Sequence, residues 1–244
     1  MKEIRIGEFA GRSFKFIAHD VPSILAQPGA MNITGVATTP DQAAHSSWWS
    51  FEDERAVRER HWHFAPGDVV LDIGPAFGSY TLPAAAQGAR VHALEPCEFC
   101  RSVLIENVAQ NPDLAPHISV VPIGVHERSG WFEPDAGEFV PEKKEGDGRQ
   151  LLRVQSIDDI VSELNLERVD CIKLDVEGAE YGALSGAKTT IRRFKPRLLV
   201  EEHEFKFAGI GPRCQGLIDA LGLGYTCERH PYHSVAHAFY EVSR

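Results

Sequence analysis

The feature that most constrains the fold is a series of short apolar runs that alternate with segments of helical character. Runs that are apolar throughout are typical of parallel strands buried on both faces by helices. The expected strands cover 69–73, 89–96, 117–125, 169–178 and 196–205, and a terminal strand pair covers 225–230 and 234–242. The expected helices cover 50–64 with Ser50 as N-cap, 81–88, 97–111, 156–164, 179–194 and 214–222. The sequence therefore predicts an α/β fold, with a short strand at 14–17 before it.

Acidic residues follow several of these strands at their carboxyl ends. They are Asp72, Glu95, Asp175 and the pair Glu201 and Glu202. In a sheet of this kind, ligands bind outside the carboxyl ends of the strands, at the switch point of the strand order. The acids therefore mark the edge where a functional site is expected.

The segment from Asp72 to Thr81 has the pattern D-x-G-x-x-x-G between a strand and a helix. Gly74 and Gly78 allow a tight turn and a close backbone approach to a ligand. The spacing differs from G-x-G-x-x-G, there is no P-loop lysine, and Asp72 would repel a phosphate but attract a cation. A glycine-rich turn that binds nothing is the alternative.

Glu95 follows the second strand, where an acid can accept hydrogen bonds from the two hydroxyls of a ribose. Its alternative role is to stabilise the N-terminus of the helix at 97–111. With Asp72 and Gly74, it points to a nucleoside that carries a positive charge and no phosphate. S-adenosylmethionine fits this description, and NAD fits it less well.

The run VLDIGPAFGSYTLPAAAQGARVHALEP is similar to the first two strands of class I S-adenosylmethionine-dependent methyltransferases. With IKLDVEGAE and LVEEH further on, residues 66–206 resemble the FkbM family of methyltransferases. The resemblance implies a Rossmann-like, seven-stranded, mostly parallel sheet with helices on both faces and an antiparallel last strand. It also implies O-methylation of a sugar or natural-product hydroxyl. Pro75-Ala76-Phe77 departs from the Ala-Asn-hydrophobic of many relatives, and Gly124 stands where they often have Ala.

The resemblance also implies where S-adenosylmethionine is held. Asp72, Gly74, Gly78 and the Tyr80–Thr81 backbone would hold the methionine part, and Glu95 the ribose. Pro96 and Val125 would lie against the adenine, and Asp175 would face the reactive end. The full set of expected cofactor contacts is Asp72, Gly74, Pro75, Phe77, Gly78, Tyr80, Thr81, Glu95, Pro96, Val125 and Asp175.

A hydroxyl acceptor needs a base to take its proton. His203 is the first candidate because histidine titrates near neutral pH, and Glu202, Glu201 and Asp175 are the others. The alternative is a Mg²⁺ site that lowers the pKa of the acceptor hydroxyl. Its ligands would come from Asp175, Glu177, Glu201, Glu202 and His203. Glu177 and Glu180 are interpreted instead as acids at the start of the following helix.

Three other groups of residues have a functional and a structural interpretation, and the structural one is favoured for the first two. Cys97-x-x-Cys100 is a redox pair or two part-buried thiols. His230, His233 and His237 form a metal site or simply lie on the terminal hairpin. Trp48, Trp49, Trp62 and His45 either line an acceptor pocket or pack the N-terminal segment.

Composition limits the partners. The chain has 244 residues and a net charge of −10, which disfavours binding to nucleic acid. It shows no apolar run long enough to span a membrane and no secretory signal, and its five cysteines suit a reduced, cytoplasmic protein. A small-molecule acceptor is expected, and a homo-oligomer is left open. A methyltransferase acting on a macromolecule and a non-catalytic nucleoside-binding module are the alternatives.

Residues 66–244 are expected to form the methyltransferase domain, and 1–65 an N-terminal extension that contributes to the acceptor pocket. The segments 133–150 and 205–213 are expected to contribute to the same pocket. The first of them is dense in Glu, Asp, Gly, Lys and Pro and is predicted as a long surface loop, either a lid or an insertion without function.

Overall fold

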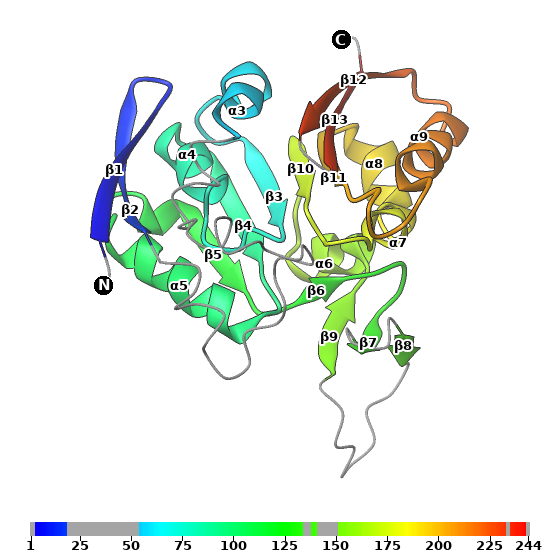
Figure 1. Ribbon diagram of the computed structural model, residues 1–244, viewed down its shortest axis with the longest axis horizontal. Helices are drawn as coiled ribbons and strands as arrows, with labels where there is room; N and C mark the ends of the chain where they lie inside the picture. The colour runs from blue at the N-terminus through cyan, green and yellow to red at the C-terminus, as the bar shows by residue number, and fades with distance from the viewer. Residues whose placement is uncertain (1–2, 19–53, 134–137, 141–150, 233–234, 243–244) are drawn as a thin grey trace. The chain divides into compact units, whose positions relative to one another are not determined.

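The computed structural model describes residues 3–18, 54–133, 138–140, 151–232 and 235–242 (Figure 1). Its largest sheet has seven strands in the order β12-β13-β11-β10-β3-β4-β5. The strands are β3 (Val69–Ile73), β4 (Arg90–Leu94), β5 (Ile118–Val121), β10 (Cys171–Leu174), β11 (Arg197–Glu202), β12 (Tyr225–Tyr232) and β13 (Val235–Val242).

The strand directions confirm the predicted fold class. β10 is parallel to both β3 and β11, and β4 is parallel to β5. β13 is antiparallel to its two neighbours, β11 and β12, so the last strand of the chain is the reversed one. All five residues of β3 and all four of β10 are buried, which explains why these strands are apolar along most of their length.

The chain divides into two compact units. The first combines Met1–Asp68 with Pro75–Pro122, and the second combines Val69–Gly74 with Ile123–Arg244. Each is described by itself below.

The first unit contains β4, β5 and an N-terminal hairpin of β1 (Glu3–Phe9) and β2 (Arg12–Ala18). Its helices are α3 (Arg55–His61), α4 (Thr81–Ala86), α5 (Glu98–Ala109) and the short 3-10 helix η2 (Ala115–His117). The hairpin packs on α4 and α5 (Figure 1).

Two asparagines of the α5 region hold the hairpin by pairing with the backbone of β2. Asn111 Oδ1 accepts from Lys15 N at 2.6 Å, and its Nδ2 donates to Lys15 O at 2.7 Å. Asn107 Oδ1 accepts from Ile17 N at 2.7 Å. These side chains satisfy backbone groups of β2 that a neighbouring strand would otherwise bond.

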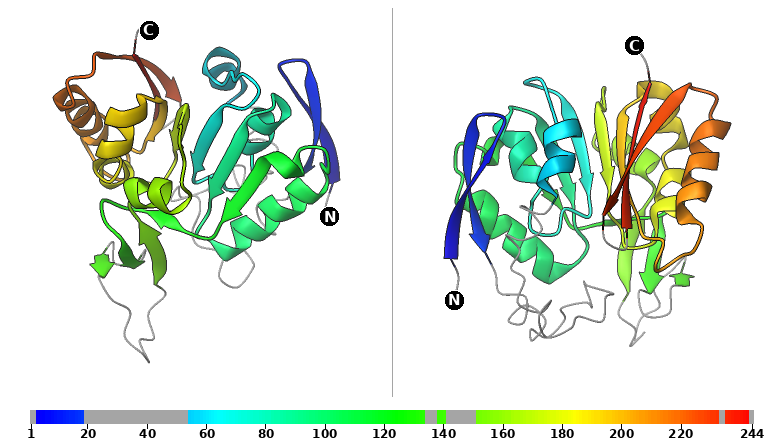
Figure 2. Two further views of the ribbon diagram at one scale, coloured as in Figure 1. Left: turned by 180° about the vertical axis from the view of Figure 1, so that it is seen from behind. Right: turned by 45° about the horizontal axis from the view of Figure 1, so that its top comes forward.

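The second unit contains β3, β10, β11, β12 and β13, together with α6 (Ile157–Glu163), α7 (Glu180–Ser185), α8 (Lys188–Phe194) and α9 (Ile210–Ala220). α7 contacts α9 and β11, and α9 lies alongside β12 and β13 (Figure 2). A separate four-stranded sheet has the order β6-β9-β7-β8. Its strands are β6 (Gly124–Val125), β7 (Gly130–Glu133), β8 (Glu138–Val140) and β9 (Leu152–Gln155).

Three sequence-based element predictions are wrong in their extent. The expected strand 117–125 is interrupted at Pro122, which has no N–H to donate, and its two parts join different sheets. The expected helix 179–194 is two helices separated at Gly186 and Ala187. The expected loop 133–150 includes the end of β7 and the whole of β8.

Other boundaries moved by less. The predicted strand at 14–17 is part of β2, and α9 begins at Ile210, inside the expected connection 205–213. The predicted helix at 156–164 is confirmed, since Ser156 caps α6 by accepting from Asp159 N at 3.0 Å. The helix expected at 50–64 is described as α3 over Arg55–His61, with Ser50 outside the described residues.

Candidate functional site

In the first unit, Glu95 joins the end of β4 to the glycine loop. The side chain is buried, and its Oε2 accepts from Ala76 N at 3.1 Å while Oε1 accepts from Cys97 N at 2.9 Å. The second bond is the helix N-terminal contact that was weighed as its alternative role. A carboxylate has about four acceptor positions, so two backbone bonds leave capacity for ligand hydroxyls.

A side chain of α5 holds the loop after Pro75 by a hydrogen bond. Asn107 Nδ2 donates to Phe77 O at 2.8 Å, while its Oδ1 holds β2. Gly78 has φ of +99°, a conformation that favours glycine, and a Cβ there would lie 2.8 Å from Leu104 Cδ1, so the leucine side chain would have to shift. Phe77 packs edge-on to Phe99, with ring centroids 6.4 Å apart.

Tyr80 and Thr81 are both buried at the start of α4. Trp62 Nε1 donates to Tyr80 O at 2.9 Å, and the two rings meet edge to face at 5.0 Å. Trp62 is therefore a packing residue that fixes Tyr80. Trp48, Trp49 and His45 lie outside the described residues.

Pro75, Pro96 and the cysteine pair complete the predicted residues of this unit. Pro75 is buried and its carbonyl accepts from Gly78 N at 2.8 Å, and the carbonyl of Pro96 accepts from Arg101. Cys97 and Cys100 are buried free thiols. A hydrogen bond with Cys97, and burial, raise the pKa of Cys100, which keeps it a thiol rather than a reactive thiolate.

In the second unit, Gly74 brings the chain against Asp175. A Cβ at Gly74 would lie 1.7 Å from the backbone oxygen of Asp175, and Gly74 has φ of +74°. Lys173 is buried and its Nζ donates to Asp175 Oδ2 at 3.2 Å and to Gly74 O at 3.4 Å. Asp72 is fully buried in β3 and is the register partner of Lys173 in β10.

His203, directly after β11, is surrounded by carboxylates. Its Nδ1 lies 2.7 Å from Glu180 Oε1, and both side chains are buried. Its Nε2 lies 3.4 Å from a Glu177 oxygen and 3.8 Å from oxygens of both Asp175 and Glu201. The ring is thus anchored at one nitrogen and faces three acids with the other. We call Asp175, Glu177, Glu180, Glu201 and His203 the histidine cluster.

The charges of the cluster set its protonation. Burial alone would lower the pKa of His203, but the hydrogen bond with Glu180 and the charges of Asp175, Glu180 and Glu177 raise it to about 9. Burial also works to raise the pKa of Asp175, but the charges of Lys173 and His203 outweigh it and hold that pKa below its ordinary value. Burial and Asp175 raise the pKa of Glu177.

Glu202, a predicted candidate base, pairs with Arg229 and Tyr240 and not with the histidine cluster. It is buried, and its two oxygens accept from Arg229 at 3.0 and 3.1 Å and from the Tyr240 hydroxyl at 3.3 Å. The neighbouring Glu201 points to the other side of the strand, toward His203 and His237. This alternation follows from the strand period of two.

Three of the remaining predicted residues form other contacts in this unit. Val125 is buried in β6, where it pairs with Gln155 of β9. His230 and His237 are cross-strand partners in β12 and β13, and His233 lies outside the described residues.

The donor atoms of Asp175, Glu177 and His203 lie within 4.8 Å of one another, close enough to hold a cation. Glu95, Cys97 and Cys100 are grouped equally closely in the first unit. A protonated His203 must lose its proton before it can bind a metal, so a cation there competes with the ion pairs of the cluster.

Three side chains at or beside the candidate site were not among the residues predicted from the sequence for these contacts. In the sequence, Lys173 is a lysine inside an apolar strand. A buried lysine charge is costly unless an acid pairs with it, so this position implies a buried acidic partner. Glu180 was interpreted as a helix N-terminal acid; it does accept from Gly178 N at 2.9 Å, but its Oε1 also contacts His203. Asn107 gave no signal, since its partners lie 90 and 30 residues away.

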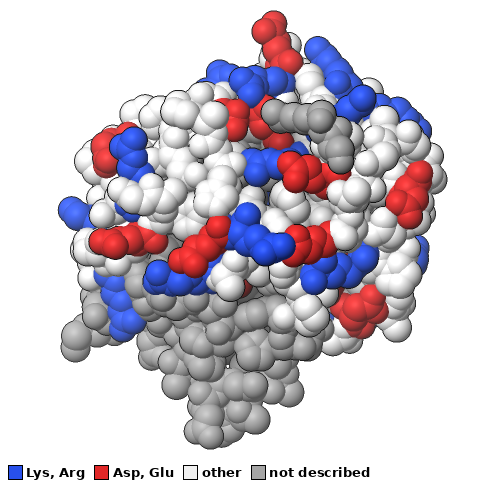
Figure 3. Space-filling model, turned by 90° about the horizontal axis from the view of Figure 1, so that it is seen from above, with Lys and Arg blue, Asp and Glu red and all other residues white. Residues whose placement is uncertain are grey.

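The surface gives two further observations. On the face shown in Figure 3, the described basic side chains lie interspersed with acidic ones rather than in one continuous stripe. Within the described residues, no helix has the length and apolar character that crossing a membrane requires.

The sequence and the fold are similar to those of known methyltransferases. Residues 72–232 match the family model described as the methyltransferase FkbM domain. The chain is 26% identical over 200 residues to the AMB antimetabolite synthetase AmbE of Pseudomonas aeruginosa, covering 64% of this chain and 9% of AmbE. It is 24% identical over 197 residues to the methyltransferase sdnD of Sordaria araneosa, covering 66% of this chain and 75% of sdnD.

Solved structures show the same fold. The FkbM methyltransferase of Methylobacillus flagellatus KT superposes with a TM-score of 0.58 and 22% identity, over 73% of this chain and 44% of that one. A putative S-adenosylmethionine-dependent methyltransferase from Streptococcus mutans superposes with a TM-score of 0.52 and 14% identity, over 98% and 55%. The chain therefore spans about a tenth of AmbE and less than half of the Methylobacillus protein.

Proposed function

Because the chain belongs to the FkbM methyltransferase family, we propose that it transfers the methyl group of S-adenosylmethionine to a hydroxyl of a small molecule. The acceptor is a sugar or a natural-product intermediate. The observation that carries the chemistry is the anchored histidine of the histidine cluster, with one ring nitrogen held by Glu180 and the other directed at carboxylates.

The residues present fit the cofactor. Gly74 and Gly78 adopt positive-φ conformations that favour glycine and let the loop turn tightly after β3. Asp72 and Glu95 are the acids expected for a cationic nucleoside, with Glu95 on the ribose. Pro75, Phe77, Tyr80 and Thr81 would shape the methionine side, and Pro96 and Val125 would lie against the adenine. When bound, S-adenosylmethionine supplies a methyl group already activated by its sulfonium.

The chain's own residues then align the acceptor and remove its proton. Alignment is the larger contribution in a displacement of this kind. The neutral form of His203 would take the proton of the acceptor hydroxyl at Nε2. Glu180 keeps the ring oriented through Nδ1, in the way a carboxylate orients the histidine of a catalytic triad. Because the pKa of His203 is about 9, this neutral form is the minor one near neutral pH, and turnover should rise with pH.

A bound Mg²⁺ is the second candidate for activating the acceptor, favoured by the close grouping of Asp175, Glu177 and His203. Mg²⁺ prefers oxygen ligands, so His203 would be an unusual member of its shell. Chelation with EDTA separates the two: a histidine mechanism keeps its full rate, and a metal mechanism loses it and regains it with added Mg²⁺.

The remaining assignments are also proposals. Residues 66–244 form the catalytic domain and 1–65 an extension that contributes to the acceptor pocket, with 133–150 and 205–213. The protein is cytoplasmic and acts on neither nucleic acid nor membrane. A role as a nucleoside-binding module without catalysis is the alternative.

The test combines binding and turnover. Calorimetry measures the affinity for S-adenosylmethionine, and a methyl-release assay with a panel of hydroxylated acceptors measures the reaction. Binding without methylation of any acceptor would support the module. The absence of binding would overturn the proposal.

A further inference from the structure

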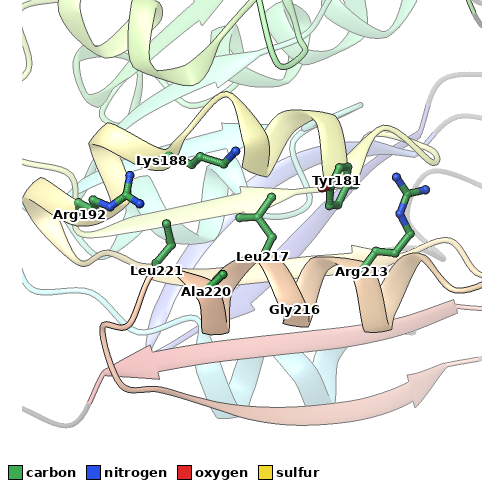
Figure 4. A pocket seen from close by; sticks show the side chains of 8 residues that line it. All are labelled: Tyr181, Lys188, Arg192, Arg213, Gly216, Leu217, Ala220 and Leu221. Atoms are coloured by element: carbon green, nitrogen blue, oxygen red, sulfur yellow. The ribbon is translucent and has the colours of Figure 1, made fainter.

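A groove in the second unit lies away from the histidine cluster. It has a volume of about 480 Å³ and runs between α8 and the start of α7 on one side and α9 on the other (Figure 4). α7 and α8 contribute Tyr181, Lys188 and Arg192 to its lining, and the α9 segment contributes Arg213, Leu217 and Leu221. α7 presents Glu180 to His203 and the next residue, Tyr181, to the groove. The two sites therefore use different faces of one helix.

The charged side chains of the groove are all basic, although the chain has ten more acidic than basic residues. Lys188, Arg192 and Arg213 are exposed, and none of them forms an ion pair within the described part of the chain. Arg213 lies over the ring of Tyr181, 4.4 Å from its centroid, which fixes its guanidinium at the groove wall. The groove thus concentrates positive charge that no ion pair among the described residues neutralises.

The floor of the groove is apolar and helical. Leu217 of α9 and its C-cap residue Leu221 lie one turn apart; Leu217 is largely buried and Leu221 half-buried. The exposed Gly216 and Ala220 form a parallel row of small residues beside them. A Cβ at Gly216 would meet no atom within 4 Å, so another backbone can approach closely there. A row of large residues beside a row of small ones is a surface on which a second helix packs.

The placement of the basic side chains favours a helix over a small anion as the ligand of the groove. Lys188 and Arg192 stand toward one end of the groove, opposite Leu221, and Arg213 stands at the other end, with Leu217 between (Figure 4). One small anion would contact one end only and leave the apolar floor uncovered. A helix with an apolar stripe flanked by acidic residues would use both ends and the floor together.

We propose that this groove docks an acidic amphipathic helix of a partner protein. The docking surface is defined by Tyr181, Lys188, Arg192, Arg213, Leu217 and Leu221. The inference uses none of the residues assigned to S-adenosylmethionine or to proton transfer, although Arg213 also belongs to the segment 205–213 that is proposed for the acceptor pocket.

The test uses the full chain and a designed, fluorescein-labelled helical peptide of about 18 residues, with leucines on one face and glutamates beside them. Fluorescence anisotropy should show binding that weakens as salt is raised. The double variant Arg192→Glu, Arg213→Glu should weaken binding at least about tenfold, because it places like charges against the peptide. Arg193→Glu is the matched control: it reverses a neighbouring exposed charge of α8 that does not line the groove, and should leave binding unchanged.

Four outcomes would overturn the proposal. A scrambled peptide of the same composition, or one with lysines for glutamates, could bind equally well. Arg193→Glu could weaken binding as much as the double variant. Inorganic pyrophosphate could bind with the same dependence on Arg192 and Arg213 and displace the peptide, which would assign the groove to a small anion. Sedimentation could show a dimer that the double variant dissociates, which would assign it to a second copy of the chain.

Discussion

Glu180 Oε1 lies 2.7 Å from His203 Nδ1, and the two side chains are buried together between the start of α7 and the end of β11. Neither the acid nor the histidine would be stable there alone, because an isolated buried charge is costly. The contact therefore explains both why His203 stays protonated near neutral pH and why its ring has one orientation.

Glu180→Gln should lower the pKa of His203 from about 9, because it removes a charge and a charge-assisted hydrogen bond that raise it. The pH at which turnover reaches its plateau should fall with it, while the rate above that plateau changes little if the ring stays in place. Histidine NMR titration and a pH–rate profile measure the two effects. A profile that does not move would remove His203 from the proton transfer. The control is Glu204→Gln, an exposed acid that contacts Gly209 and Gly211 instead.

The same shift makes stability depend on pH. Since the folded pKa of His203, about 9, lies above the ordinary histidine value of 6.5, its protonation stabilises the fold fully below about pH 6.5, and this contribution is lost as pH rises through about 9. The free energy of unfolding should fall over this window in the wild type and fall less in His203→Gln. Denaturant unfolding at intervals of pH measures it. Parallel curves for the two proteins would contradict the raised pKa.

Glu95→Ala should weaken S-adenosylmethionine binding by about 1.5–3 kcal/mol, the contribution of hydrogen bonds to a charged group. It should also destabilise the fold, since Ala76 N and Cys97 N lose their acceptor. Calorimetry below the unfolding temperature separates the two effects. Glu98→Ala is the control, because Glu98 is exposed in the first turn of α5. Equal affinity for the Glu95 variant and the wild type would withdraw the ribose assignment.

Gly74→Ala should be much more destabilising than Gly222→Ala. Both glycines have positive φ, +74° and +66°, so each substitution incurs about 1–2 kcal/mol of backbone strain. Only Gly74 also faces a backbone atom, the Asp175 oxygen at 1.7 Å from the new Cβ, whereas Gly222 faces open space. Thermal unfolding of the two variants isolates the clash. Similar losses would show that the loop and Asp175 separate easily.

Most strands of the seven-stranded sheet could be predicted from the sequence, but the side-chain contacts of the candidate site could not. Apolar runs identified β3, β4, β10 and β11, and the strand ends placed Asp72, Glu95, Asp175 and Glu201 correctly with respect to their strands. Periodicity could not show that Pro122 divides a strand between two sheets, because both halves are apolar. Nor could it distinguish a helix N-terminal acid from the partner of a histidine 23 residues away, because Glu180 is both.

The double use of Asn107 has a consequence for anyone who shortens this protein. One amide group bonds Ile17 of the hairpin with its oxygen and Phe77 of the glycine loop with its nitrogen. A truncated protein that begins after the hairpin would lose the bond between Ile17 and Asn107. The Asn107 amide could then rotate, and its hydrogen bond to Phe77 of the glycine loop would weaken. β1 and β2 therefore help to hold the glycine loop in place, although they precede the residues 72–232 that match the family model.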